Sequence, residues 1–162
     1  MDRETQVKKL HRNPLLNRIA LTMGDPRGIG PELVSKLFNN LNNFPNLALL
    51  IIGDYGILEF ALKKFGNQRA KAWFKKVSVL DDEKKLIEEK NKIIILNLSR
   101  LNPREIISEG SIKAQGEASL RYIEAGVRFC QNGLCSGLVT LPVSKLALMK
   151  AGCPFPGHTE LL

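Results

Sequence analysis

The sequence predicts an α/β domain in which helices cover both faces of a mostly parallel sheet. Short apolar runs without alternation recur along the chain, which is typical of strands buried on both faces. Segments with apolar residues at helical spacing lie between these runs, and this alternation is the pattern of a parallel sheet. With 162 residues, of which 44% are hydrophobic, the chain is long enough for one globular domain with a sizeable core.

The N-terminal region predicts a tail, a first strand and a first helix. Residues 1–17 are polar, basic and aperiodic, so we expect a basic flexible tail. The apolar run 18–23 indicates a buried strand, and Gly24-Asp-Pro ends it. A helix is expected from Pro31, because proline and an acidic residue suit its first turn, and one face then carries Leu33, Val34, Leu37, Phe38 and Leu41.

The middle of the chain predicts three further strands. The run 47–52 is apolar without alternation, which suits a strand covered on both faces, and Gly53-Asp54 ends it. A helix is expected from Tyr55 to about Phe65. Further strands are predicted at 77–80 and 92–98.

The last third of the chain predicts the clearest helix. Residues 102–111 include proline, glycine and polar residues and are the best candidate for a linker or crossover. The run 137–141 indicates another buried strand, and a short helix is expected over 143–150. Residues 115–132 have helical periodicity, with Ala118, Tyr122, Ala125 and Phe129 recurring on one face.

Composition limits the classes of function. Three irregularly spaced cysteines and no secretory leader favour a reducing cytoplasm. No apolar run approaches the roughly 20 residues that cross a bilayer. The net charge of +8 permits an anionic partner, and a basic nucleic-acid-binding domain is one alternative. Because the cations are spread over several segments and accompany no recognised nucleic-acid motif, a solvated surface is favoured and nucleic acid is an unlikely partner.

The loop from Gly24 to Glu32 is the first candidate binding loop, since it joins a strand to a helix in an open α/β sheet. Gly24, Gly28 and Gly30 permit a tight turn and close approach of a ligand near Asp25. The following helix directs its partial positive charge toward the loop. The spacing matches neither the dinucleotide fingerprint nor a P-loop. A structural turn and an anion-binding loop both remain open.

The segment 152–160, Gly-Cys-Pro-Phe-Pro-Gly-His-Thr-Glu, is the second candidate binding loop. Its two prolines restrict φ and are expected to hold His158 and Thr159 rigidly. His158 offers a hydrogen-bond donor or a proton carrier near neutral pH, and Thr159 offers a hydroxyl group. Lys145 offers a cation for phosphate or carboxylate. Purely structural roles remain equally open: Lys145 can be solvated, His158 can be hydrogen-bonded within its loop, and Thr159 can only cap a helix.

A zinc site is a weaker alternative. Cys130, Cys135, Cys153 and His158 are suitable ligand types, but gaps of four, seventeen and four residues do not form compact ligand pairs. The cysteines are therefore expected to be small buried apolar groups.

Four stretches together resemble the 4-hydroxythreonine-4-phosphate dehydrogenases, a family of pyridoxal 5'-phosphate synthesis. The resemblance runs from about residue 18 to residue 162, and Arg27 and Leu141 are its modest departures. The stretches are Thr22-Met-Gly-Asp-Pro-Arg-Gly-Ile-Gly-Pro-Glu32, Tyr122-Ile-Glu124, Val139-Thr-Leu-Pro-Val-Ser-Lys145 and Ala151-Gly-Cys-Pro-Phe-Pro-Gly-His-Thr-Glu-Leu161.

The resemblance implies an isocitrate/isopropylmalate dehydrogenase-like fold, in which two α/β lobes flank a cleft, and a homodimer. It implies oxidation of 4-(phosphooxy)-L-threonine with NAD or NADP and a divalent metal (Zn, Mg or Co), followed by decarboxylation to 3-amino-2-oxopropyl phosphate. The family's substrate-contacting His-Thr pair falls on His158 and Thr159. Residues 18–162 then correspond to the N-terminal portion of the family fold, with a lobe boundary near 100–115.

The resemblance also implies that the C-terminal half of the family fold is missing. The metal-binding histidines and the nicotinamide-binding segments are expected in that half, so we expect a truncated chain with no dehydrogenase activity of its own. A paralogous dehydrogenase of threonate or erythronate phosphate is the alternative within the enzyme class.

Overall fold

The computed structural model describes residues 18–108, 111–155 and 157–162. The expected tail at 1–17 lies outside the described residues, as do the side chains of Ile107 and His158.

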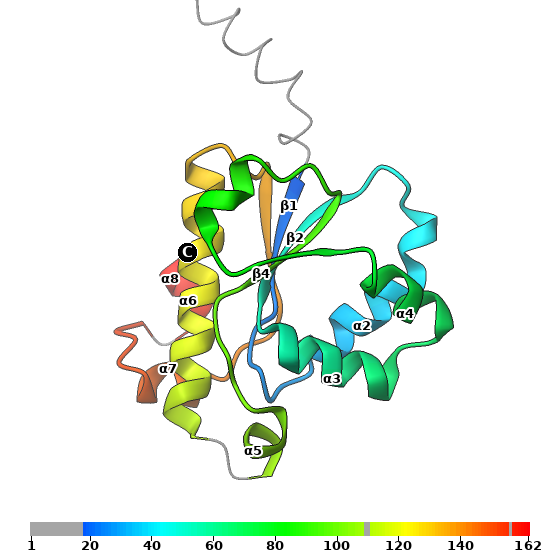
Figure 1. Ribbon diagram of the computed structural model, residues 1–162. Coiled ribbons are helices and arrows are strands. Elements are labelled where there is room, and N and C mark those ends of the chain that lie inside the picture. The colour runs from blue at the N-terminus through cyan, green and yellow to red at the C-terminus, as the bar shows by residue number, and fades with distance from the viewer. Residues whose placement is uncertain (1–17, 109–110, 156) are drawn as a thin grey trace, which may run out of the picture.

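Within the described residues, five parallel strands form one sheet, which confirms the predicted α/β class (Figure 1). The strand order is β3-β4-β2-β1-β5, and every neighbouring pair is parallel. The strands are β1 (Arg18–Thr22), β2 (Ala48–Gly53), β3 (Ser78–Leu80), β4 (Ile93–Asn97) and β5 (Gly137–Thr140).

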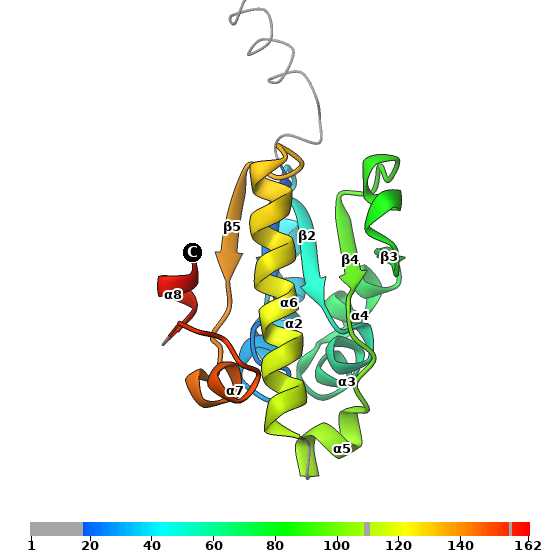
Figure 2. The same cartoon turned by 90° about the vertical axis from the view of Figure 1, so that its left-hand side faces the viewer.

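Helices cover both faces of the sheet, as predicted. In Figure 2, α6 (Ile112–Gln131) crosses in front of the sheet, and α2 (Gly30–Asn40), α3 (Tyr55–Phe65) and α4 (Gln68–Phe74) lie behind it. The helix α7 (Lys145–Lys150) packs against α6. The remaining helices in the described part of the chain are α5 (Pro103–Ser108), α8 (His158–Leu161) and the 3-10 helices η2 (Leu41–Asn43) and η3 (Glu83–Ile87).

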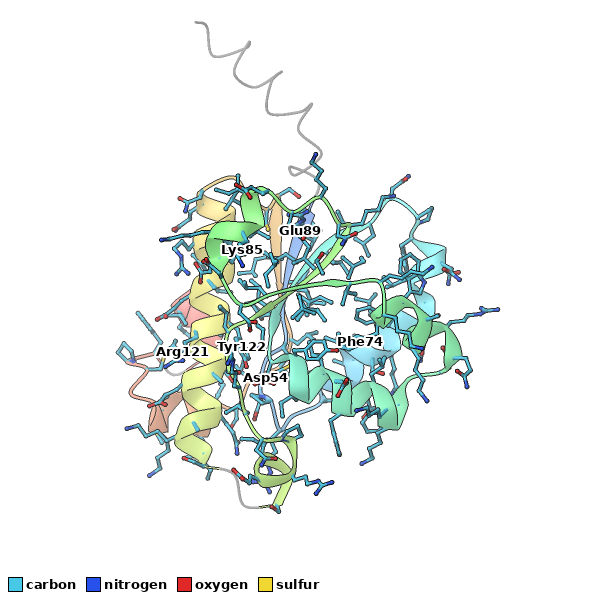
Figure 3. The ribbon with its side chains drawn as sticks, in the orientation of Figure 1. Asp54, Phe74, Lys85, Glu89, Arg121 and Tyr122 are labelled. Carbon is cyan, nitrogen blue, oxygen red and sulfur yellow. The ribbon has the colours of Figure 1, made fainter. Side chains whose placement is uncertain are left out.

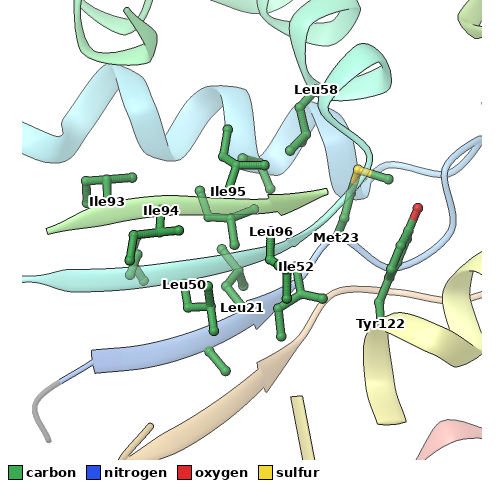
Figure 4. Close-up of a cluster of buried hydrophobic side chains, with 14 of the residues drawn as sticks. Leu21, Met23, Leu50, Ile52, Leu58, Ile93, Ile94, Ile95, Leu96 and Tyr122 are labelled. Atoms are coloured by element: carbon green, nitrogen blue, oxygen red, sulfur yellow. The ribbon is translucent and has the colours of Figure 1, made fainter. Parts of the chain in front are cut away.

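The core lies on both sides of the central strands (Figure 4). Ile94 and Ile95 are adjacent in β4 and therefore point to opposite faces, yet both are fully buried. The same holds for Leu50 and Ile51 in β2. Full burial of each such side chain stabilises the fold by roughly 1.5–3 kcal/mol, which explains why apolar runs without alternation form these strands.

The strand order places a topological switch point at β1. The chain leaves β1 through α2 to its neighbour β2, and it later returns through α6 to β5 on the other side of β1. Connections in opposite directions put α2 and α6 on opposite faces. Ligands of open α/β sheets bind beside such a point, at the carboxyl ends of the strands. The loop that follows β1 and the loop that follows β5 both lie there.

Two predicted elements differ from the structure. We predicted that 137–141 is a buried strand, but β5 is an edge strand, and Val139 is 48% exposed because the face opposite α6 is uncovered there. The proposed linker at 102–111 contains the short helix α5, and the long helix begins at Ile112, earlier than expected, because Ser111 caps it by accepting from the Ala114 amide.

Residues on both sides of 100–115 contribute strands to the same sheet, since β5 pairs with β1. The lobe boundary in this region stays a prediction. Among the described parts of the chain, no helix is long and apolar enough to cross a membrane.

Candidate functional site

The loop after β1 is held tightly against the loop after β5. Gly24 has a φ of 75°, and a Cβ on it would lie 2.4 Å from the carbonyl oxygen of Pro142. The amide of Asp25 donates to that same carbonyl at 3.0 Å. Only glycine allows both the positive φ and this approach. The two candidate loops are therefore direct neighbours at the carboxyl ends of β1 and β5.

Further contacts make the loop after β1 a stiff turn. The Asp25 carboxylate accepts from the Arg27 amide at 2.9 Å, and the Gly28 amide donates to the Asp25 carbonyl at 2.9 Å. A Cβ on Gly30 would lie 1.9 Å from the Met23 carbonyl oxygen. Carbonyls of the chain itself thus occupy the space beside Gly24 and Gly30, so packing within the chain accounts for both glycines.

The second candidate loop brings Lys145 toward the 157–160 corner. Ser144 caps α7 by accepting from the Ala147 amide at 3.2 Å, so Lys145 is the first residue of that helix. Its Cε lies 3.5 Å from the position of a Cβ on Gly157, next to His158 in the chain. Lys145 and Thr159 are both exposed, and Lys145 has no hydrogen-bond or ion-pair partner among the described residues.

The corner is anchored through the residues that precede it. Cys153 is buried, and its amide donates to the Leu148 carbonyl at 3.0 Å, which ties the corner to α7. The carboxylate of Glu160 approaches within 2.9 Å of the Cβ position on Gly157. The side chain of His158 lies outside the described residues. The roles of His158, Thr159 and Lys145 in substrate binding therefore stay predictions.

Sequence reasoning missed a buried polar network at the same edge of the sheet (Figure 3). Asp54, which follows β2, is 1% exposed and caps α3 by accepting from the Ile57 amide at 3.1 Å. Its other oxygen accepts from the Ser99 hydroxyl at 2.8 Å and from the Leu101 amide at 2.7 Å. The available signal was an aspartate directly after a buried strand and three residues before a helical amide.

Tyr122 of α6 completes this network through its contact with Ser99. The only proton of the Ser99 hydroxyl goes to Asp54, so the Tyr122 hydroxyl donates to Ser99. Burial raises the pKa of Tyr122 above its ordinary value, which keeps the phenol protonated and able to donate. The network joins β2, the loop after β4 and α6, and it stiffens this part of the edge.

A cavity of about 400 Å³ lies beside Asp54, over the ends of β2, β3 and β4. Asn97 donates to Asp81 at 2.7 Å, and Arg100 lies 3.6 Å from the same carboxylate. The charged groups in this wall are therefore paired with each other.

The residues that the structure describes do not fit a divalent metal. They contain no group of three histidine, cysteine, aspartate or glutamate side chains that could hold an ion. Burial raises the pKa of Cys135 to about 12, so its thiol stays protonated and is a poor ligand. Nor does the glycine loop offer a dinucleotide cradle, because carbonyls of the chain fill the space beside Gly24 and Gly30.

The chain is similar to curated proteins that are named as dehydrogenases of phosphorylated compounds. A protein of Bordetella bronchiseptica named D-threonate 4-phosphate dehydrogenase is 31% identical over 149 residues, which is 89% of this chain and 40% of that protein. A 4-hydroxythreonine-4-phosphate dehydrogenase of Desulforapulum autotrophicum is 31% identical over 144 residues, covering 89% of this chain and 41% of its own length. The chain thus spans about 40% of the length of the curated relatives it matches.

Solved structures agree with the predicted fold. The crystal structure of a 4-hydroxythreonine-4-phosphate dehydrogenase from Burkholderia phymatum matches with a TM-score of 0.73 and 28% identity, over 90% of this chain and 42% of that one. The family described as "Pyridoxal phosphate biosynthetic protein PdxA" matches residues 46–162, which include β2 to α8, Lys145 and the 157–160 corner. The chain belongs to the PdxA family.

Proposed function

We propose that this chain supplies part of a dehydrogenase that oxidises and decarboxylates 4-(phosphooxy)-L-threonine in pyridoxal phosphate synthesis. The observation that carries the proposal is the family match over 46–162, which includes Lys145, His158 and Thr159. The product is 3-amino-2-oxopropyl phosphate. The whole enzyme is a cytoplasmic homodimer.

The chain's own contribution is substrate binding at the 157–160 corner. The Lys145 ammonium attracts the phosphate or carboxylate, the Thr159 hydroxyl offers a donor and an acceptor, and His158 offers an imidazole donor. Exposure of Lys145 and Thr159, and the approach of Lys145 to Gly157, support this assignment. In a family-length protein, NAD or NADP would supply the hydride acceptor and a divalent metal (Zn, Mg or Co) would supply a Lewis acid, and we expect segments outside the stretch that this chain spans to hold both.

The test is calorimetric titration of the chain with 4-(phosphooxy)-L-threonine. We expect binding that is lost on His158→Ala and weakened about tenfold by Lys145→Gln or Thr159→Val, the effect of one lost hydrogen bond to a charged group. Lys150→Gln is the matched control, since it removes an equal charge from the other end of α7. Equal weakening in the control would show general charge attraction and contradict the proposal.

D-threonate 4-phosphate is the second candidate substrate, because relatives 31% and 38% identical to this chain carry that name, the latter as putative. The two compounds differ at C2, where 4-(phosphooxy)-L-threonine has an amino group and D-threonate 4-phosphate has a hydroxyl group. Titration of both compounds separates the candidates by their ratio of dissociation constants.

We predict that the 162-residue chain by itself reduces neither NAD+ nor NADP+ in the presence of 4-(phosphooxy)-L-threonine and Zn2+ or Mg2+. The described residues contain no ligand cluster for the ion, and the sequence has only two histidines. Absorbance at the nicotinamide band measures the rate. Formation of more than one NADH or NADPH per polypeptide chain would overturn this prediction.

A further inference from the structure

A second cavity, of about 270 Å³, lies between the loop after β1 and α3, on the face opposite α6 and α7. Its walls are apolar, with Ile57, Phe60 and Phe65 from α3 and Pro31 from the start of α2. Phe60 and Phe65 are each 38% exposed, so their rings are available to a ligand. The volume is just below the roughly 300–1,000 Å³ of drug-sized sites, which limits the ligand to one ring or a short chain.

Two unpaired cations stand at this cavity. Arg27 and Lys64 both line it, and neither has an acidic partner in the described ranges. The Lys64 ammonium lies 5.1 Å from the centre of the Phe65 ring, which keeps it over the apolar wall. The one carboxylate of the lining, Glu32, is paired with Lys36 at 2.6 Å. The cavity therefore has a surplus of positive charge.

The wall that carries Arg27 is rigid, although the Arg27 side chain is exposed. Its amide is bound to the Asp25 carboxylate, and Asp25 is bound in turn to Pro142. A preorganised wall reduces the conformational entropy that the protein loses when a ligand binds. An apolar floor next to two cations without acidic partners suits an anion with an aromatic or short aliphatic body, since the rings contact the body and the cations contact the charge.

We propose that this cavity is a binding site for a small aromatic anion, with Arg27 and Lys64 contacting the anionic group and Phe60 and Phe65 contacting the ring. The site is separate from the Lys145 corner, because α2 and α3 lie on one face of the sheet and α6 and α7 on the other. It does not depend on the proposed dehydrogenase function.

Phenyl phosphate is the probe, titrated into the 162-residue chain by calorimetry and by amide chemical shifts. We expect millimolar or tighter binding that shifts the amides of residues 27–30, 32 and 57–65. Arg27→Gln and Lys64→Gln should each weaken it about tenfold, the effect of one charge-assisted hydrogen bond. Phe60→Ala should weaken phenyl phosphate but leave inorganic phosphate unchanged.

Lys63→Gln is the matched control, because Lys63 precedes Lys64 in α3, carries the same charge and is paired with Glu59 at 2.8 Å instead of lining the cavity. Binding unchanged in this variant supports the site. Equal weakening by Lys63→Gln, no binding by the folded chain, or binding lost on Lys145→Gln instead would each overturn the proposal.

Discussion

The carboxylate of Asp54 shows how one residue can hold three segments together. It is almost fully buried and accepts hydrogen bonds from the amides of Ile57 and Leu101 and from the Ser99 hydroxyl. Burial of a charge is tolerated only where its oxygens are satisfied in this way. The residue therefore fixes α3, the loop after β4 and, through Ser99, the hydroxyl of Tyr122.

Replacement of Asp54 by alanine should lower the free energy of unfolding by about 3–5 kcal/mol, because it leaves the buried Ile57 amide, the partly buried Leu101 amide and the Ser99 hydroxyl without their acceptor. Urea denaturation followed by circular dichroism measures the loss. Asp81→Ala is the control: its carboxylate is 56% exposed, its ion pair with Arg100 is long and the hydrogen bond that it accepts from Asn97 is exposed to solvent, so the loss should be at most about 1 kcal/mol. Similar losses in both variants would contradict the role of burial.

Tyr122 should make stability depend on pH in the alkaline range. Burial raises its pKa in the folded state, so the unfolded chain releases the phenol proton first, at about pH 10. The stabilisation that the protonated Tyr122 phenol gives to the folded state is therefore fully present below about pH 10. Above that pH the free energy of unfolding falls by at most about 1.4 kcal/mol per pH unit. We would measure the free energy of unfolding of the unmodified chain and of Tyr122→Phe from pH 8 to 11. The difference between the two values should shrink above pH 10, because the other titratable groups are the same in both proteins and cancel in the difference. A difference in unfolding free energy that stays constant from pH 8 to 11 would contradict a raised pKa of Tyr122 in the folded state.

At the scale of elements, two glycines of α6 control how closely it approaches its neighbours. A Cβ on Gly116 would lie 1.9 Å from the Ala147 carbonyl oxygen of α7, a backbone atom that moves only with its helix. A Cβ on Gly126 would meet Leu138 Cδ1 at 2.6 Å, which is the flexible end of a side chain. The same residue type thus has different importance at two positions of one helix.

Gly116→Ala should destabilise the fold by roughly 1–3 kcal/mol through overpacking, more than the gain of up to about 1 kcal/mol in helix propensity. It should also displace α7 and weaken ligand binding at Lys145. Gly126→Ala should change stability by less than about 1 kcal/mol, because Leu138 can rotate away. Thermal melts and amide shifts of 145–150 measure both effects. An unperturbed α7 in Gly116→Ala would show that the helices have room to separate.

At the scale of the whole molecule, the strand order leaves β5 at one edge of the sheet and β3 at the other. An edge strand presents unpaired amides and carbonyls to other chains. β5 also presents Val139, and α7, which follows it in the chain, presents Leu146 and Met149, which are 50% and 62% exposed. β3 has only three residues, and the charged segment 81–91 follows it.

We predict that the chain self-associates through β5. Val139→Lys should shift the chain toward monomer in light scattering at several concentrations, because a lysine on an edge strand opposes pairing. Val79→Lys on β3, where the exposed fraction of valine is a similar 41%, should have little effect. If both variants associate as the unmodified chain does, the edge of β5 is not the contact.

Local patterns in the sequence predicted which segments form helices and which form strands, and most of the predicted ends of these elements agree with the structure. The helix at 55–65 and the strands at 48–53 and 93–97 arise from apolar runs and end signals that lie within each segment. Family membership and the α/β class were also within reach of the sequence, because the motifs around residues 22–32 and 151–161 are distinctive. The family model matches residues 46–162, which include the second motif. Such signals are local, so no knowledge of the tertiary contacts is needed to read them.

The tertiary structure alone decided which segments meet. An apolar run indicates burial but not a neighbouring strand, so the edge position of β5 was missed. Asp54 and Ser99 are 45 residues apart, and Ser99 and Tyr122 are 23 apart, so their network depends on strand order. Gly24 faces backbone carbonyls of the loop after β5, and Gly30 faces the backbone carbonyl of Met23. Periodicity reports how deeply a residue is buried, whereas its partner is set by how the strands and helices are arranged in space.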